Sequence, residues 1–230
     1  MTETDEEFRA RLRAFLSDHH PGRGPRGAAE RHRWQREWQA TTYDHGYAGP
    51  SWPREFGGMD LTFAQQVVYH EEFAHARVPR VVGTGLGIAA PTIIKYGTPD
   101  QKERWLRPML RGDKVWVQGY SEPGAGSDLS SLTTAAHRDG DVYVVNGQKV
   151  WTTQGAFGDI IFALVRTGSR DSRHDGISYL VIDAHAEGVT VRPLRDITGG
   201  HAFSEVFLED VRVPVADRIG FFRRYCGMLG

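Results

Sequence analysis

The segment best suited to chemistry is a small-residue loop that follows a predicted strand. It reads QGYSEPGAGSD, residues 118–128, and overlaps the strand-like run KVWVQGYS. Glycines in such a loop turn the chain. They also clear space, so that backbone N–H groups and small hydroxyls can reach a ligand. The pattern therefore predicts either a plain turn or a ligand-binding loop.

Three other motifs that suggest chemistry fail on spacing. In HEEFAH the histidines His70 and His75 are five apart, whereas zinc ligation from one helix face needs a spacing of four. The glycines of VVGTGLG, residues 81–87, do not have the dinucleotide-binding spacing, and close helix packing explains them better. The chain has no G-x-S-x-G nucleophile elbow. We expect no metal site and no Ser-His-Asp triad.

The composition is that of an ordinary globular protein, with 40% apolar and 25% charged residues. A net charge of −1 argues against nucleic acid or an anionic membrane surface as the main partner. The single cysteine, Cys226, excludes an intrachain disulfide and fits a reducing compartment. The acidic start MTETDEEFRARL lacks a signal core, and no run approaches the ~18 apolar residues of a membrane span. We therefore predict a cytoplasmic protein that binds neither nucleic acid nor membrane.

The first 113 residues have helical periodicity. Thr4 and Glu7 have the spacing of a capping box. The apolar residues that follow on one helical face are Phe8, Leu12, Phe15 and Leu16. Thr62 is the expected cap of a helix that carries Phe63, Val67 and Phe73. A further capping box is expected between Thr98 and Gln101.

After Gly112 the hydrophobic period changes to two. Short runs rich in Val, Ile, Tyr and Thr follow, among them DVYVVN, QKVWTT, DIIFALVRT and GISYLVIDA. Asp139-Gly140 and Asn146-Gly147 separate consecutive runs, and each predicts a hairpin turn. The predicted fold class is α+β multidomain, with an all-helical domain over residues 1–113 and an antiparallel β-barrel or sandwich over 114–214. Trp105 and Trp116 are expected in the core.

The loop and several segments around it resemble the acyl-CoA dehydrogenase family. QGYSEPGAGSDLSSL is similar to the flavin-binding signature of that family. The likeness continues, in the family's order, through VNGQKVWTTQGAFGD, RHDGISYLVID and FSEVFLEDVRVPVADRIG, and upstream in GPSWPREFGG and YGTPDQKERWLRPMLRGD. It covers nearly all of residues 30–220. The resemblance implies an N-terminal helical domain followed by a middle β domain.

The resemblance also implies that FAD lies along the β domain and contacts two segments. The expected cofactor-binding residues are Gln118, Tyr120, Ser121, Gly126, Ser127, Trp151, Thr152 and Thr153. Ser127 also matches a position that touches the acyl-CoA substrate in the family. The structural alternatives are a hydroxyl that caps its own loop for Ser127 and a core side chain for Trp151. Glu122 and Asp128 are expected to hold the turn through backbone N–H groups.

The implied reaction is α,β-dehydrogenation of an acyl-CoA thioester, in which a base removes the α-proton and the β-hydride moves to flavin N5. The α-proton is weakly acidic, so the thioester carbonyl must be polarised by hydrogen bonds and the flavin must be close. A desolvated carboxylate base completes such a site. The expected partners are acyl-CoA, an electron-transfer flavoprotein or another electron acceptor, and further chains in a homo- or hetero-oligomer.

The resemblance ends near Gly220. The family continues with a C-terminal helical bundle that carries the glutamate base in most members, but residues 215–230 form a short tail that ends in FFRRYCGMLG. No glutamate of this chain matches that base, so no catalytic residue is expected in it. Three interpretations follow: a truncated or frameshifted dehydrogenase, one subunit of a heteromer whose partner supplies the bundle, or a non-catalytic module that binds flavin or acyl-CoA. A flavin monooxygenase or oxidase on the same fold is a further alternative.

Overall fold

A computed structural model describes residues 3–220, apart from the side chain of Arg170. The chain divides into two compact units, which are described separately. The first comprises Met1–Val82 and Trp105–Asp113, and the second comprises Gly83–Arg104 and Lys114–Gly230. The predicted domain boundary between residues 113 and 114 stays a prediction. The predicted tail of residues 215–230 lies outside the described residues from residue 221 onward.

The first unit is helical, as its periodicity predicts. Its main helices are α1 (Asp5–Asp18), α2 (Ala28–Asp44) and α3 (Phe63–Ala76), with a short 3-10 turn η1 at Arg54–Phe56. The capping box expected at Thr4 and the helix cap expected at Thr62 are both present, and the second is a full capping box as well. The Thr4 side chain accepts from the N–H of Glu7, and the Thr62 side chain accepts from the N–H of Gln65. Each cap satisfies backbone donors that a helix start would otherwise leave without partners.

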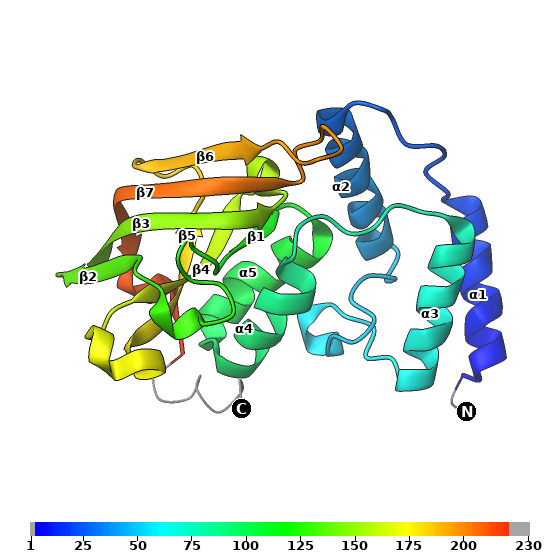
Figure 1. Cartoon of the computed structure of the whole chain (residues 1–230). Coiled ribbons are helices and arrows are strands. Elements are labelled where there is room, and N and C mark those ends of the chain that lie inside the picture. Colours follow the sequence, from blue (N-terminus) through cyan, green and yellow to red (C-terminus); the bar gives the residue numbers. More distant parts are fainter. Residues whose placement is uncertain (1–2, 221–230) are drawn as a thin grey trace. The chain divides into compact units, whose positions relative to one another are not determined.

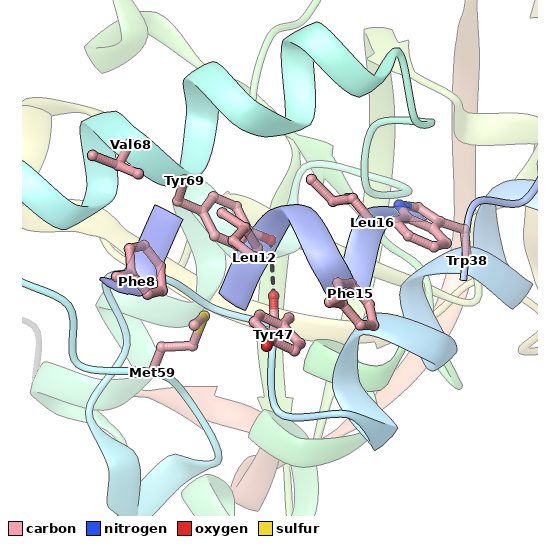
Figure 2. Packing of buried hydrophobic residues seen from close by; sticks show 9 residues of the cluster. All are labelled: Phe8, Leu12, Phe15, Leu16, Trp38, Tyr47, Met59, Val68 and Tyr69. Carbon is pink, nitrogen blue, oxygen red and sulfur yellow. Dashed lines mark hydrogen bonds between the residues drawn. The ribbon is translucent and has the colours of Figure 1, made fainter. Parts of the chain in front are cut away.

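The core of this unit forms on the predicted face of α1. Phe8, Leu12, Phe15 and Leu16 are all buried, which confirms the prediction for this helix. The residues that pack with them are Trp38, Tyr47, Met59, Val68 and Tyr69. Figure 2 shows Tyr69 of α3 directed at Tyr47, and its hydroxyl donates to the Tyr47 carbonyl over 2.8 Å. A tyrosine hydroxyl buried in an apolar core needs such a partner.

Of the three apolar residues named for α3, only Phe73 packs against the core, where it is half-buried. Phe63 is 83% exposed and Val67 is 44% exposed, whereas Val68, Tyr69 and Glu72 are buried. Glu72 is neutralised by guanidinium groups of α1, since Arg13 donates to its carboxylate over 2.8 Å and Arg9 also bonds to it. These ion pairs link α1 to α3 beside the apolar core.

The second unit begins with helical segments. A π-helical turn η2 at Gly85–Ala89 leads into α4 (Ala90–Tyr96). Helix α5 (Pro99–Arg111) begins in this unit, and its residues from Trp105 onward belong to the first unit. The predicted box at the start of α5 is present, because the Thr98 N–H donates to Gln101 Oε1 over 3.0 Å and the Gln101 N–H donates back to the Thr98 hydroxyl. Trp105 and Trp116 are buried, as expected.

An eight-stranded sheet forms the body of the second unit (Figure 1). The strands are β1 (Trp116–Gly119), β2 (Ala135–Asp139), β3 (Val142–Thr153), β4 (Ile160–Arg166), β5 (Ile177–Asp183), β6 (Val189–Leu194), β7 (Phe203–Pro214) and β8 (Arg218–Ile219). Their order is β6-β7-β3-β2-β4-β5-β8, with β1 paired to β4. Short 3-10 turns, η3 (Leu129–Ser131), η4 (Gly155–Phe157), η5 (Arg170–Gly176) and η6 (Val215–Asp217), connect them. Most pairs are antiparallel, but β1 and β2 each meet β4 in parallel.

One of the two predicted hairpins is confirmed and the other is wrong. Asp139-Gly140 leads into the turn between β2 and β3, with Gly140 in the left-handed region at φ 59°. Asn146-Gly147 makes no turn, because β3 runs straight through it and only shifts register against β7. The Asn146 side chain exchanges hydrogen bonds with Asp210 of β7. Gly147 lies so close to the neighbouring chain that a Cβ there would be 2.5 Å from the hydroxyl oxygen of Thr134. This glycine therefore serves a β-bulge and a close approach.

Candidate functional site

A second irregularity in β3 presents Trp151 to solvent. The register of β3 against β7 shifts between Lys149 and Thr152. Within that shift Trp151 has φ 61°, a left-handed conformation that costs a bulky residue about 1–3 kcal/mol. The indole is 62% exposed and meets Phe203 edge-on at 6.0 Å. Trp151 is therefore not a core side chain, so the structural alternative considered for this residue is wrong.

The two threonines that follow Trp151 lie on opposite sides of the strand. Thr153 is exposed, like Trp151, whereas Thr152 is fully buried. The Thr152 hydroxyl has no hydrogen-bond partner among the described residues, and the same holds for Ser204, which pairs with it across β7. A ligand on the Trp151 surface would thus meet the side chain of Thr153, but only the backbone of Thr152.

The loop after β1 forms a tight turn that leaves its tip in solvent. Glu122 and Ala125 exchange backbone hydrogen bonds of 2.8 and 3.1 Å around the Pro-Gly pair. Gly126 and Ser127 beyond the turn are exposed. No hydrogen bond between described residues uses the Ser127 hydroxyl, so it does not cap its own loop. That structural alternative is also wrong.

The start of the same segment is more enclosed. Gln118, Tyr120 and Ser121 are half-buried. The ring of Tyr120 packs edge-on against Phe162 at 5.7 Å and against Tyr179 at 6.4 Å. Tyr120 thus fixes the exit of the chain from β1.

The structure brings the two predicted segments together. The backbone N–H of Val150, next to Trp151, donates to the carbonyl of Ser121 over 2.9 Å. The loop after β1 and the bulge in β3 are therefore immediate neighbours, although they are distant in sequence. Both belong to the second unit.

A buried ion pair holds this junction. The ammonium of Lys149 donates to Glu122 over 2.8 Å, to the Leu164 carbonyl over 2.6 Å and to the Tyr120 carbonyl over 3.2 Å. Its side chain is 0% exposed and that of Glu122 is 3% exposed. Three acceptors use all three N–H donors of a charged lysine. The pair therefore fixes the loop to β3 in one register.

The Glu122 carboxylate also closes the far end of the loop. It accepts from the backbone N–H of Thr133 over 2.6 Å and from that of Thr134 over 3.0 Å. This confirms the expectation that Glu122 holds the turn through backbone N–H groups. Asp128 instead accepts from the Ser130 hydroxyl over 2.5 Å. Sequence reasoning missed Lys149, and its only signal was a lysine within the predicted strand QKVWTT.

The ionisation of Glu122 follows from these contacts. Burial by itself raises the pKa of a carboxyl group, but the charge of Lys149 and the hydrogen bonds from Lys149, Thr134 and Thr133 outweigh it. The pKa of Glu122 falls to about 2. Burial lowers the pKa of Lys149, and the Glu122 carboxylate opposes that shift. The three acceptors around the ammonium and the lowered pKa of Glu122 favour a charged pair.

The exposed part of the junction is suited to a flat ligand with a polar edge. A Cβ on Gly124 or Gly126 would meet nothing within 4 Å, so space is open beside the loop. The hydroxyls of Ser121, Ser127 and Thr153 make no hydrogen bond with other described residues and can turn to a ligand. Trp151 adds an exposed aromatic face. An isoalloxazine ring, which is flat, apolar on its faces and polar along one edge, fits this donor set.

Comparison with known families agrees with this geometry. The acyl-CoA dehydrogenase N-terminal domain matches residues 2–113, and the acyl-CoA dehydrogenase middle domain matches residues 117–211. The chain belongs to the acyl-CoA dehydrogenase family. The resemblance and the fold class predicted from the sequence, a helical region followed by a β-sheet domain, are both confirmed. Members of this family are typically FAD-dependent.

Several relatives are similar over most of the chain. The acyl-CoA dehydrogenase IpdE1 of Mycobacterium tuberculosis is 41% identical over 90% of this chain and 56% of that protein. Among solved structures, the ChsE4-ChsE5 complex from Mycobacterium tuberculosis matches with a TM-score of 0.83 at 36% identity, over 100% of this chain and 60% of that one. The Tcur3481-Tcur3483 steroid ACAD (acyl-CoA dehydrogenase) matches with a TM-score of 0.80 at 34% identity, over 96% of this chain and 58% of that one.

The chain therefore spans less than two thirds of the length of these acyl-CoA dehydrogenases. The helices within residues 3–220 include none that is long and apolar enough to cross a bilayer.

Proposed function

We propose that the junction of residues 118–127 and 151–153 binds FAD, and that the chain is the flavin-binding subunit of a heteromeric acyl-CoA dehydrogenase. The observation that carries this proposal is the exposed indole of Trp151, held in a strained left-handed bulge beside a loop with free hydroxyls. Strain of this kind persists where the surrounding structure enforces it, and it concentrates at functional sites. Membership in the acyl-CoA dehydrogenase family supports FAD as the ligand of this surface.

FAD at this surface would supply a two-electron acceptor for the β-hydride of the substrate. Trp151 would give the ring system an apolar contact, and the Thr153 hydroxyl would donate to its polar edge. The residues proposed to contact FAD are Gln118, Tyr120, Ser121, Gly126, Ser127, Trp151, Thr152 through its backbone, and Thr153. Ser127, at the exposed loop tip, would also contact the acyl-CoA.

The substrate is proposed to be an acyl-CoA thioester with a steroid-type acyl group. The support is the likeness to a steroid ACAD at 34% identity. The carboxylate that removes the α-proton is proposed to come from a partner chain. The likeness to the ChsE4-ChsE5 complex, in which two different chains assemble, supports this division of labour. Electrons would leave to an electron-transfer flavoprotein or another acceptor.

A titration followed by turnover tests the proposal. The purified chain, alone and co-purified with a candidate partner of the same family, is titrated with FAD while flavin fluorescence and the visible spectrum are recorded. We expect saturable binding with a perturbed flavin spectrum, and acyl-CoA-dependent reduction of a dye only when both chains are present. Folded protein that leaves the flavin spectrum unchanged in both preparations would refute the flavin site. Turnover by the single chain would refute the division of labour.

A further inference from the structure

The side chain of Arg166 is buried at the end of β4, where it links two loops of the second unit. One guanidinium nitrogen, Nη2, donates to the carbonyl of Ser130 over 2.6 Å, and Nε lies 3.5 Å from that of Leu132. The third guanidinium nitrogen, Nη1, donates to the carbonyl of Arg173 over 2.6 Å and lies 3.4 Å from the carbonyl of Ser169. A single planar cation thus holds η3 on one side and η5 on the other.

The Arg166 guanidinium has an unusual set of hydrogen-bond partners. Within residues 3–220 no carboxylate forms an ion pair with Arg166, and only backbone carbonyls surround the guanidinium. An arginine is always charged, and a buried charge without a counter-ion is costly unless its hydrogen bonds are satisfied. Lysine offers three donors around a point and does not reproduce a planar fork of five. The site therefore requires the geometry of arginine, not only its charge.

The η5 loop is shaped around the guanidinium. A Cβ on Gly176 would lie 2.3 Å from Ser172 Oγ and 2.6 Å from Arg166 Nη1, so only glycine lets the chain approach this closely. Arg173, whose carbonyl receives one of the short hydrogen bonds, has the left-handed φ of 44°. A non-glycine residue holds such a conformation only when its surroundings enforce it. The bond to Arg166 supplies that constraint.

The η3 loop is the continuation of the proposed ligand-contacting loop. Asp128 and Ser127 directly precede η3 in the chain. The Ser131 hydroxyl donates to the Asp128 carbonyl over 2.7 Å, so a shift of η3 is passed back toward Ser127. The other half of the loop is anchored by Lys149 at Tyr120 and Glu122, and Glu122 also accepts from the backbone of Thr133 and Thr134 after η3. Two buried cations thus anchor the two halves of one loop.

We propose that Arg166 is a positioning residue for the thioester substrate, which it affects through the Ser127 half of the loop, while the Lys149 anchor and the Trp151 bulge serve the flavin. The inference rests on the proposed function. Loss of the Arg166 anchor should weaken binding of an acyl-CoA thioester on the order of 10–100-fold, the usual effect of removing a residue that orients a ligand contact. FAD affinity should change by less than about threefold, since only Gly126 and Ser127 of the proposed flavin contacts lie in that half, and the contacts at residues 118–121 and 151–153 keep their own anchor.

The test uses the full chain, co-purified with its partner where one is required, in four forms: wild type, Arg166→Ala, Arg166→Lys and Gly176→Ala. Gly176→Ala keeps the charge and displaces the guanidinium. Arg212→Ala is the matched control, since Arg212 is an exposed arginine of the same unit that pairs with Asp139. FAD binding is measured by flavin fluorescence, octanoyl-CoA binding by calorimetry on FAD-loaded protein, and local order by amide hydrogen exchange. Guanidinium ion is added to Arg166→Ala at millimolar concentration.

We expect faster exchange in residues 127–132 and 169–176 of the three test variants, unchanged exchange in residues 151–153, and weaker octanoyl-CoA binding at nearly constant FAD affinity. Added guanidinium should restore part of the loss in Arg166→Ala but not in Gly176→Ala.

If Arg166→Ala does not fold, the other two variants decide. Equal losses of FAD and thioester affinity, or exchange that rises across the whole unit, would overturn the proposal. A wild type that binds FAD but, in the same calorimetry, binds neither octanoyl-CoA nor the steroid thioester cholyl-CoA would overturn it too. A wild type that binds no FAD would refute the flavin site, and exchange at residues 127–132 would still decide whether Arg166 orders the loop.

Discussion

Lys149 and Glu122 form an ion pair of 2.8 Å in which neither side chain is more than 3% exposed. A buried pair of this kind contributes little compared with an apolar pair of equal volume, but its loss on one side is expensive. Its importance here lies in position, because it joins β3 to the loop that we propose contacts the flavin. The first two predictions concern this pair.

Removing both partners of the pair should cost less stability than the sum of the two single removals. Lys149→Met leaves a buried carboxylate without its cation and should lower the free energy of unfolding by about 3–5 kcal/mol. The double variant Glu122→Gln/Lys149→Met should lose less than the sum of the two single losses, by about 1–3 kcal/mol. Urea unfolding of the four proteins measures the difference. Strictly additive losses would contradict the idea that the two groups depend on each other.

Acid should destabilise the chain through Glu122. Folding lowers its pKa from an ordinary value near 4.5 to about 2. A carboxyl group whose folded pKa is lowered contributes stability that is present above the unfolded pKa and is lost as the pH falls toward the folded pKa. The window between pH ~4.5 and ~2 corresponds to about 3 kcal/mol.

The measurement for Glu122 is urea unfolding at several values of pH between 6 and 2.5, for the wild type and for the double variant that lacks both charges. The wild type should lose stability more steeply below about pH 4.5 than the double variant does. Equal slopes for the two proteins would show that other carboxyl groups cause the acid sensitivity.

Trp151→Gly should separate stability from flavin binding. Glycine relieves a left-handed strain of about 1–3 kcal/mol. The lost contact with Phe203 and the greater entropy of the unfolded chain destabilise the protein by a similar amount. The free energy of unfolding should therefore change by less than about 1 kcal/mol. FAD affinity should fall about 10–100-fold in both Trp151→Gly and Trp151→Ala, because the aromatic contact is gone.

Phe63→Ala is the control for Trp151, since Phe63 is an aromatic residue of the first unit that is 83% exposed. It should leave FAD affinity unchanged in the same fluorescence titration. A loss of FAD affinity in Phe63→Ala as large as that in Trp151→Ala would mean that the bulge is not the flavin contact.

Two glycines of β3 and its turn should respond differently to alanine. Gly147→Ala places a Cβ 2.5 Å from the hydroxyl oxygen of Thr134 and should cost about 2–3 kcal/mol. Gly140→Ala has open space around the new Cβ and should cost only the left-handed backbone, about 1–2 kcal/mol. Thermal and urea unfolding rank the two variants. The reverse order would mean that the bulge at Gly147 relaxes easily.

Local chemistry made the helix starts predictable. The caps at Thr4, Thr62 and Thr98 depend on residues within one turn, and all three have the bonds that their spacing predicts. The same local reasoning failed at Asn146-Gly147. There the decisive contacts come from Asp210 and Thr134, which lie far away in sequence, and the glycine that suggests a turn is needed for a close approach.

Only part of the site could be predicted from the sequence, because its other contacts come from residues far away in the chain. Trp151 and Ser127 stand in segments that resemble a known signature, and the structure places both on the surface. Lys149 and Arg166 look like ordinary charged residues in strands. Their partners are carbonyls and a carboxylate supplied by other strands and loops, such as Glu122 and Leu164 for Lys149. Neither a hydrophobic period nor a motif in the sequence indicates which carbonyls surround these cations, because those carbonyls come together only after the sheet has formed.

The acceptors of the Lys149 ammonium also set an order of events during synthesis. Tyr120 and Glu122 emerge from the ribosome before Lys149, but the short bond to the Leu164 carbonyl needs all of β4. Until that strand has left the exit tunnel, the nascent chain has the loop of residues 118–127 without its full set of anchoring bonds. Final ordering of this loop is therefore a late event in vectorial folding, and a ribosome stalled before residue 164 should carry it in a protease-sensitive state.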